Sequence, residues 1–505
     1  MSGLHERLCA LSPATLAGIR RGVEKESLRV RPDGTLALTP HPAALGSALT
    51  HPHITTDFSE SQLELVTGVH AGVESCLEEL TQIHQFVYRA LGDDMLWVAS
   101  MPCGLPVDET IPIGRYGSSN VGRAKSVYRM GLGHRYGRRM QTISGIHYNW
   151  SMPGVTDEGY FALIRNFRRH SFLPLILFGA SPAVCSSFVA GRSHELQQLT
   201  EHTLYMPHAT SLRMGRLGYQ SDAQASLAVS YNSLEGYATS LQEALTRPYA
   251  PYAAIGVRNP GGEYNQLATS LLQIENEFYG TIRPKRVTSP GERPLHALRE
   301  RGVEYVEVRC MDLDPFVPVG IGAATMRVLD MFLLHCLLAE SLPDTPQEIA
   351  AIGRNQQRIA VRGREPGLRL ECDGGEVPLA EWGEKVLEEC APIAAGLDAA
   401  QGGATHRDAL QAALADWRAP AALPSARMLS AMARDHDGSY IGFAKAQSRR
   451  TREALLDTAF SAGVEAHFEG LAQQSSDEQK RIEAADTLPF ETYRQEYLSA
   501  KRLGS

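Results

Sequence analysis

The chain has 505 residues, and its 49 Lys and Arg against 57 Asp and Glu give a formal net charge of −8. Phosphate binding needs a basic surface, so this balance argues against a nucleic-acid partner. With 43% hydrophobic and 21% charged residues, the composition is typical of a globular protein and excludes a largely disordered one. The length fits roughly three domains of about 150 residues, or one large α/β or α+β domain.

The N-terminus and the cysteines predict a cytoplasmic protein. Residues 1–18 lack the basic region, apolar core and cleavage site of a secretory signal. The longest apolar run, residues 331–339, contains His335 and is far shorter than the ~20 residues that span a bilayer, so we expect a buried helix and no membrane association. The eight cysteines form no C-x-x-C pair, which disfavours structural zinc and a disulfide scaffold and predicts reduced thiols.

In chain order, strand-like runs alternate with Gly, Pro and Asn loops up to about residue 320. Strands are expected over residues 23–31, 53–67, 140–152, 271–280 and 303–313, helices over 73–90 and 160–169, and a loop-rich stretch over 101–120. After residue 321 the pattern is helical almost throughout. The irregular alternation favours an α+β fold with a mainly antiparallel sheet. We expect a catalytic core over 1–320 and a helical region over 321–505 packed on it, either as a second unit or within one continuous domain.

The common nucleotide and hydrolase motifs are missing from the sequence. There is no G-x-x-x-x-G-K-[ST], and no G-x-G is extended to G-x-G-x-x-G, so a P-loop and a Rossmann site are unsupported. G-x-S-x-G and H-E-x-x-H are also absent.

Three expected strands carry acidic residues on one face, because residues two apart on a strand point the same way. Glu24 and Glu26 share a face, and two adjacent carboxylates repel each other unless a cation lies between them. Taken alone, this pair fits a solvated edge better than a metal site. Asp57 and Glu60 precede Glu64, which alternates with leucines and so presents its carboxylate away from an apolar face.

The remaining strands add a base and an imidazole. Glu307 and Arg309 share one face, although this pattern alone is equally compatible with a salt-bridged surface. Gln141, His147 and Asn149 are expected on one face of their strand. Carboxylates with one imidazole suit Mg²⁺, with Mn²⁺ as a substitute, whereas zinc usually recruits more His or Cys. The sequence therefore predicts a magnesium site.

Basic and aromatic residues complete the set of candidates. Arginines offer planar forks for carboxylate or phosphate, and tyrosines can line a small-molecule pocket. Singly, each would be assigned to the surface; together with the acids they indicate phosphoryl transfer from ATP. These residues are Tyr128, Arg129, Arg213, Tyr219, Tyr279, Arg283, Lys285 and Arg286.

The same segments, in order, resemble the bacterial group 1 form of the glutamate–cysteine ligase family. The resemblance runs from about Gly18 into the helical tail and is carried by residues 22–30, 44–67, 140–153, 177–188, 208–219, 273–286 and 302–316. It implies an ATP-dependent carboxylate–amine ligase whose core is a curved antiparallel sheet of the glutamine-synthetase type, built around several Mg²⁺ ions.

The resemblance also assigns roles to residues. It implies metal ligation by Glu24, Glu26, Asp57, Glu64, His147 and Glu307. Arg309, with Glu307, is expected to act on the transferred phosphoryl group, and Glu60 is expected on the surface. The substrate-binding residues, mostly around a cysteine pocket, are expected to be Phe58, Tyr128, Arg129, Gln141, Arg213, Tyr219 and Tyr279.

The implied reaction joins the γ-carboxylate of L-glutamate to L-cysteine, with ATP, through γ-glutamyl phosphate, as the first step of glutathione biosynthesis. One alternative is a related glutamate ligase that uses another amine, which the pocket residues Arg213, Tyr219 and Tyr279 would discriminate. The other is a non-catalytic relative that binds metal or nucleotide. The partners expected are these small molecules, and no obligatory protein partner is inferred.

Overall fold

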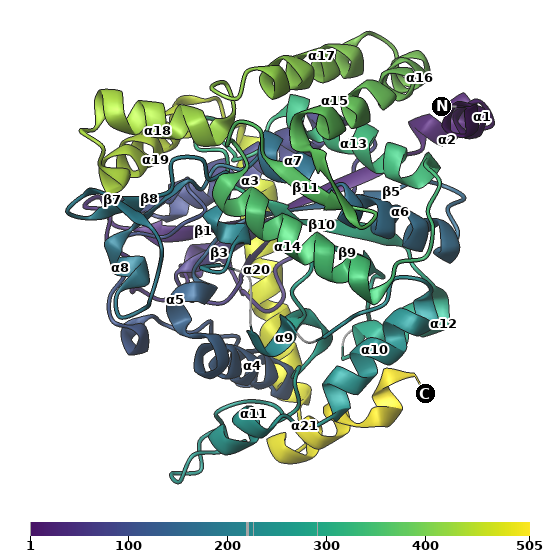
Figure 1. Cartoon of the computed structure of the whole chain (residues 1–505). Coiled ribbons are helices and arrows are strands. Elements are labelled where there is room, and N and C mark those ends of the chain that lie inside the picture. The colour runs from purple at the N-terminus through teal and green to yellow at the C-terminus, as the bar shows by residue number, and fades with distance from the viewer. Residues whose placement is uncertain (1, 219–221, 226, 290, 505) are drawn as a thin grey trace.

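A curved antiparallel sheet forms the centre of the molecule (Figure 1). The computed structural model describes residues 2–218, 222–225, 227–289 and 291–504. The sheet runs in the order β2-β3-β1-β5-β10-β9, and β4 pairs with the far end of β1. Its strands are β1 (Arg20–Val30), β2 (Ile54–Thr56), β3 (Gln62–Val66), β4 (Met95–Leu96), β5 (Ile146–Ser151), β9 (Ile282–Lys285) and β10 (Tyr305–Met311).

Two smaller sheets and many helices surround the central sheet. The small sheets are β6 (Ala183–Cys185), β8 (Thr203–Tyr205) and β7 (Gln197–Thr200), and the hairpin β11 (Arg369–Cys372) and β12 (Gly375–Pro378). The helices up to β10 are α1 (Ser2–Cys9), α2 (Pro13–Ala17), α3 (Val73–Ala90), α4 (Asn120–Tyr136), α5 (Arg138–Gln141), α6 (Asp157–Arg169), α7 (Phe172–Leu177), α8 (Ser186–Val189), α9 (Asp222–Ala225), α10 (Leu234–Thr246), α11 (Ala250–Ile255) and α12 (Pro294–Arg301). After β10 follow α13 (Ala323–Leu338), α14 (Pro346–Arg362), α15 (Leu379–Glu389), α16 (Ala391–Gln401), α17 (Thr405–Arg418), α18 (Pro424–Asp435), α19 (Tyr440–Asp457), α20 (Ala462–Ala485) and α21 (Phe490–Leu498). Short 3-10 turns are η1 (Ala43–Leu45), η2 (Asp108–Thr110), η3 (Leu212–Met214), η4 (Glu275–Glu277) and η5 (Ala500–Leu503).

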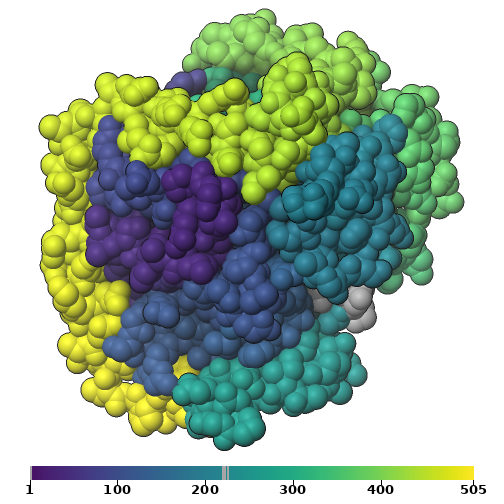
Figure 2. Space-filling model, turned by 90° about the vertical axis from the view of Figure 1, so that its left-hand side faces the viewer, coloured from purple at the N-terminus to yellow at the C-terminus, as the bar shows by residue number. Residues whose placement is uncertain are grey.

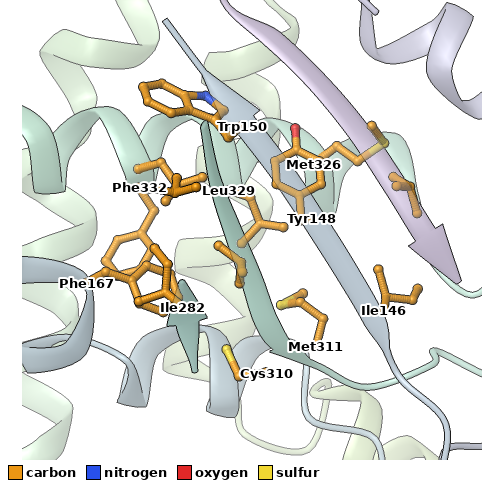
Figure 3. Packing of buried hydrophobic residues seen from close by; sticks show 14 of the residues in the cluster. Ile146, Tyr148, Trp150, Phe167, Ile282, Cys310, Met311, Met326, Leu329 and Phe332 are labelled. Carbon is orange, nitrogen blue, oxygen red and sulfur yellow. The ribbon is translucent and has the colours of Figure 1, made fainter. Parts of the chain in front are cut away.

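One face of the sheet is apolar and covered by helices. Ile146, Tyr148 and Trp150 alternate along β5 and are fully buried against α6 and α13, where Phe167 and Phe332 lie (Figure 3). Burying each large apolar side chain stabilises the fold by about 1.5–3 kcal/mol. Since side chains alternate along a strand, the polar residues between these three must point to the opposite face.

A buried polar network joins this apolar layer to the sheet. Arg21 on β1 donates from Nε to Asp330 Oδ2 at 3.1 Å, and the Tyr148 hydroxyl donates to Asp330 Oδ1 at 2.8 Å. Asp330 is the one acid in an otherwise apolar stretch of α13, and this ion pair explains its burial. The helix is thereby fixed in register against β1 and β5.

A β-bulge interrupts the pairing of β10 with β5. Val308 pairs with Tyr148 and Met311 pairs with Ile146, so Arg309 and Cys310 together stand opposite the single residue His147. A bulge bends the strand and re-aims its side chains. It allows Met311 and Val308 both to pack on the apolar face while Arg309 stays on the polar one.

The C-terminal helices return to the N-terminal part of the chain. In Figure 2 the yellow C-terminal residues run along one edge, against purple and blue N-terminal residues. Ser47 N donates to Ser475 Oγ of α20 at 2.9 Å, and the Asn120 amide donates to Asp486 Oδ1 at 2.6 Å. One hydrophobic cluster extends from Leu8 to Leu503 and includes residues on both sides of residue 320. Within the described residues, no helix is long and apolar enough to cross a membrane.

The α+β fold with its antiparallel sheet is confirmed, as are the helix over 73–90 and the buried helix around 331–339. Three local predictions are wrong. Residues 53–67 are broken into β2 and β3 by a turn, residues 140–145 precede β5 without belonging to it, and residues 271–280 contain η4 and no strand. The C-terminal part is mainly helical, as expected, and also contains the short β11–β12 hairpin.

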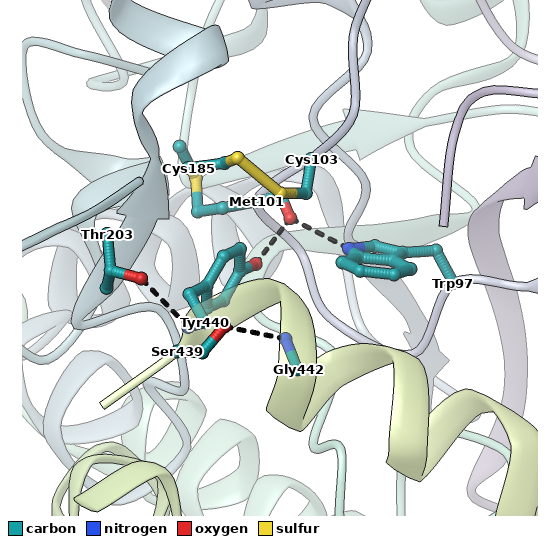
Figure 4. The surroundings of a disulfide bond; sticks show 8 residues. All are labelled: Trp97, Met101, Cys103, Cys185, Thr203, Ser439, Tyr440 and Gly442. Carbon is teal, nitrogen blue, oxygen red and sulfur yellow. Dashed lines mark hydrogen bonds between the residues drawn. A yellow bond between two sulfur atoms is a disulfide. The ribbon is translucent and has the colours of Figure 1, made fainter. Parts of the chain in front are cut away.

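The expectation that all cysteines are reduced is also wrong for one pair. Cys103 and Cys185 form a disulfide across 82 residues of sequence, in a cluster with Trp97, Met101 and Tyr440 (Figure 4). The Trp97 indole and the Tyr440 hydroxyl both donate to the Met101 carbonyl. Only the tertiary fold brings the two thiols together, so no local spacing could have shown the pairing.

Candidate active site

Strand register brings the predicted acidic residues together on the polar face of the sheet. Glu26 on β1 pairs with Glu64 on β3, and Glu24 pairs with His147 on β5. Glu307 on β10 pairs with Asn149, which is two residues from His147 on the same face. Residues directly opposite each other in an antiparallel pair have Cβ atoms about 5 Å apart. The group Glu24, Glu26, Glu64, His147 and Glu307 is called the acid cluster below.

His147 lies at the centre of the acid cluster. Its Nδ1 is 3.1 Å from Glu24 Oε2 and 3.9 Å from Glu307 Oε1, and its Nε2 is 3.7 Å from Glu26 Oε1. Asn149 Nδ2 donates to the other oxygen of Glu24 at 2.9 Å. Among the described residues, Glu24, Glu64 and His147 each offer one ligand atom within 4.8 Å of the other two. The five side chains therefore surround one small volume.

Negative charge in the acid cluster is only partly balanced. Burial and the carboxylates of Asp57 and Glu64 raise the pKa of Glu26 well above its usual value. Burial and the charges of Glu24 and Asp57 raise the pKa of Glu64 to about 8. For Glu24, burial raises the pKa, but the His147 hydrogen bond and nearby cations outweigh it and the pKa is lowered. Crowded carboxylates with one imidazole are a donor set that fits Mg²⁺ or Mn²⁺.

Cations lie on the Glu307 side of the acid cluster. Arg309 Nη1 donates to Glu307 Oε2 at 2.9 Å, and Lys285 Nζ donates to Glu307 Oε1 at 3.1 Å. Burial raises the pKa of Glu307, but Arg309 and Lys285 outweigh it, and the pKa is well below its usual value. Glu307 itself is 1% exposed, whereas Arg309 and Lys285 are 21% and 27% exposed. Both cations can therefore reach a ligand that enters from solvent.

Helix α4 adds a second basic face, near Glu64 and Asp57. Arg129 Nε donates to the Asp57 carbonyl oxygen, and its guanidinium stacks over Tyr116 at 4.5 Å. Lys125, one turn earlier, has its pKa lowered to about 8 by burial and by Arg129, against the opposing effect of Glu64. Lys125 was missed in the sequence, although its i, i+4 spacing from Arg129 places both on one helix face.

Arg213 is placed behind the bulge of β10. It lies in η3, is 1% exposed, and donates from Nη2 to the Arg309 carbonyl at 3.0 Å. A Cβ on Gly145 would lie 2.0 Å from Arg213 Nη2, so only glycine leaves room for the guanidinium. The Gly145 N–H donates to Glu26 Oε2 at 2.7 Å. Arg213 and Gly145 thus fix the positions of Arg309 and Glu26.

The other predicted substrate-binding residues are distributed around the acid cluster. Gln141 is in α5, not on the strand with His147, and its Nε2 donates to the Tyr279 hydroxyl at 2.8 Å. Tyr128 is on α4 and half buried, and Phe58 is 1% exposed in an apolar cluster. Tyr219 lies outside the described residues.

Glu60, which the sequence assigns to the surface, is buried instead. It is 5% exposed, and its carboxylate accepts the backbone N–H of His41 at 2.9 Å and of Arg115 at 2.8 Å. A carboxylate that caps two loop amides needs no solvent, which is why an acid in a turn can be buried here.

A cavity of about 330 Å³ lies beside Lys285, next to the acid cluster. It has a basic rim and two tyrosines, and a short apolar wall is contributed by α12. Its lining includes Tyr237, Arg283, Lys285, Arg286, Leu298 and Tyr305. Such a lining suits an anionic ligand with an aromatic or apolar part.

The sequence is similar to that of a known protein family and of its relatives. Residues 9–359 match the family model described as glutamate–cysteine ligase. A relative named glutamate–cysteine ligase from Saccharophagus degradans is 48% identical over 502 residues, covering 95% of this chain and 94% of the relative. One from Alcanivorax borkumensis is 46% identical, with 98% of each chain covered.

Two solved structures share the fold. A crystal structure of glutamate–cysteine ligase from Francisella tularensis in complex with AMP superposes with a TM-score of 0.91 at 35% identity, covering 96% of this chain and 98% of that one. A bifunctional glutathione synthetase from Pasteurella multocida superposes with a TM-score of 0.72 at 23% identity, covering 93% of this chain and 58% of that one.

Proposed function

This chain belongs to the glutamate–cysteine ligase family and is an ATP-dependent ligase that joins L-glutamate to L-cysteine, and we propose that the acid cluster with Arg309 and Lys285 is its catalytic centre. The observation that carries this assignment is the meeting of crowded carboxylates and solvent-accessible cations at Glu307. A triphosphate is held by metal ions, which carboxylates bind, and by positively charged side chains, so its site needs carboxylates and cations together.

The proposed reaction has two steps. An oxygen of the glutamate γ-carboxylate attacks the γ-phosphorus of ATP, the bond to the bridging oxygen breaks, and ADP leaves. Arg309 donates to the equatorial oxygens as charge develops on them. The cysteine amine then attacks the carbonyl carbon of γ-glutamyl phosphate, phosphate departs with the bonding electrons, and the amine gives up a proton. A free carboxylate would not undergo this attack, because an oxide is a poor leaving group.

We propose that Glu24, Glu26, Glu64, His147 and Glu307, with Asp57 beside them, hold Mg²⁺. The raised pKa values of Glu26 and Glu64 support this, because their repulsion is relieved by a cation. Bound Mg²⁺ would neutralise phosphate charge and orient the triphosphate. The protein's own contribution is the rigid sheet that fixes the donors and the Arg309 guanidinium that Glu307 orients.

The nucleotide is proposed to enter by the cavity beyond Lys285. Arg283, Lys285 and Arg286 line it, Lys285 also donates to Glu307 of the acid cluster, and Tyr237 and Tyr305 offer flat surfaces for a base. The AMP complex of the Francisella tularensis relative supports nucleotide binding by this fold.

The amino-acid substrates are proposed to bind on the opposite side, near α4. Tyr128, Arg129, Gln141 and Tyr279 lie there, and Gln141 and Tyr279 are already hydrogen-bonded to each other. Arg213 was expected among the residues of the cysteine pocket; its burial and its hydrogen bond to the Arg309 carbonyl favour a supporting role for this part of its guanidinium. Phe58 would act as an apolar wall beneath this group.

We also place the chemistry in residues 1–320, braced by 321–505, and the reaction in the cytoplasm, where its ATP and amino-acid substrates are formed.

The test is ADP release with Mg²⁺, ATP and glutamate, adding one amine at a time. We expect strong acceleration by L-cysteine. Equal turnover with glycine or ammonia would show that another amine serves as well as cysteine, and equal turnover with water would show ATP hydrolysis without ligation. ATP binding without any turnover would indicate a non-catalytic relative.

A further inference from the structure

A second cluster of metal-ligating side chains lies behind the sheet, away from the acid cluster. His170 is the C-cap of α6, and His335 and Cys336 are consecutive in α13. Each offers one ligand atom, and within the described part of the chain these three atoms lie within 4.8 Å of one another. His335 and Cys336 are 1% and 0% exposed, and His170 is half buried.

The two imidazoles have buried nitrogens that no hydrogen bond satisfies. Nδ1 of His170 and Nδ1 of His335 are both enclosed and without a hydrogen-bond partner. A buried polar atom of this kind costs free energy and is ordinarily paired with protein, water or an ion.

A carboxylate supports this arrangement from outside. Glu389, the last residue of α15, places Oε2 2.9 Å from Nε2 of His335. Metal-binding histidines commonly donate their second ring N–H to a carboxylate, which orients the ring and fixes its tautomer. With Nε2 donating to Glu389, Nδ1 of His335 carries the free lone pair, and it is this atom that is buried and unpaired.

We propose that His170, His335 and Cys336 bind a thiophilic divalent metal ion of the Zn²⁺ type. Two imidazoles and a thiol are the donors that Zn²⁺ prefers, whereas Mg²⁺ avoids them. The thiol of Cys336 would bind the metal as a thiolate, so binding releases its proton. The half-exposed His170 and Glu389, which is 28% exposed, provide the way in. A bound ion would tie together α6, α13 and α15.

The probe is Co²⁺, whose thiolate complexes absorb in the near ultraviolet. The titration is done under argon without added thiol, so that the Cys103–Cys185 disulfide stays closed, and with excess Mg²⁺. It uses a Cys9→Ser/Cys372→Ser background, because these are the cysteines with exposed or half-exposed thiols, and Cys9 lies 3.6 Å from His5. The acid cluster has no sulfur donor and gives no thiolate band.

We expect one equivalent of Co²⁺ to produce the band, and Cys336→Ser to abolish it. Glu389→Ala should weaken binding by about 10–100-fold through its effect on His335. Cys76→Ser, another buried cysteine, is the matched control and should change nothing. The Trp382 ring lies 5.8 Å from that of His170, so bound Co²⁺ should quench the fluorescence of Trp382 and give a second readout. Trp382→Phe should remove this quenching. Absence of the band in the background protein, or its persistence in folded Cys336→Ser, would overturn the proposal.

Discussion

Replacing Arg309 by alanine tests whether this guanidinium acts on the moving phosphoryl group. Arg309 donates to Glu307 at 2.9 Å, and Lys285 holds the other Glu307 oxygen at 3.1 Å. Glu307 keeps Lys285 as a counter-ion in the variant, so the loss of stability should be on the order of 1.5–3 kcal/mol, the value of a hydrogen bond to a charged group. Loss of one transition-state donor should lower kcat by about 10²–10³, or roughly 2.7–4 kcal/mol.

The matched control is Lys285→Met, which removes the other cation from Glu307. If Arg309 served only to balance Glu307, both variants would lose kcat equally. Because Lys285 lines the cavity that we propose for the nucleotide, we expect its variant chiefly to raise the KM for ATP. The assay is steady-state ADP release with each substrate varied in turn, on protein whose Tm is measured first. Equal kcat losses, or an Arg309→Ala effect confined to one amino acid's KM, would refute the reasoning.

Three further predictions concern the acid cluster, its support and the pH dependence of stability. Glu26→Gln should raise the Tm of the metal-free protein, because it relieves cross-strand repulsion of about 0.2–1 kcal/mol. The same variant should lose the increase in Tm that Mg²⁺ gives the wild-type protein. If Mg²⁺ raises the Tm of the variant as much as that of the wild type, Glu26 is not a metal ligand. Gly145→Ala places Cβ 2.0 Å from Arg213 Nη2, so the guanidinium must move by over 1 Å. We expect kcat/KM to fall about 100-fold as a result. The control is Gly353→Ala, whose Cβ meets nothing within 4 Å and which should leave kcat/KM unchanged. Burial lowers the pKa of His51 from 6.5 to about 4. Between these pH values the unfolded chain binds a proton at His51 and the folded chain does not, so the free energy of unfolding should fall as the pH drops from 6.5 to 4. His51→Asn, whose amide oxygen can accept the same two backbone N–H groups, should make that slope shallower in urea titrations.

The alternation of side chains on strands was sufficient to predict the face on which the acids lie. Glu24 and Glu26, and Glu307 and Arg309, do share faces, because these segments form unbroken strands up to the bulge. The same rule was wrong for Gln141, because residues 140–145 do not belong to the strand.

What the sequence could not show was how the strands pair. The alternation says which way Glu26 points, but only the register places it opposite Glu64. In the same way, the burial of Glu60 and the position of Arg213 beside Gly145 depend on loops that pack across the sheet. The disulfide arises from such a long-range contact as well. Local patterns determine direction along a strand, whereas these features depend on contacts between segments far apart in the chain.

The register also determines when during folding the acid cluster can exist. Glu24 meets His147 across 123 residues, and Glu307 meets Asn149 across 158, so no short segment contains the cluster. Closing such long loops is slow, and each pairing brings one more carboxylate toward those already in place. Assembly of the cluster therefore works against the repulsion among its carboxylates. A divalent cation that binds the assembled cluster, and not the separate strands, would stabilise the folded chain by mass action, so Mg²⁺ would support the fold of the enzyme as well as its chemistry.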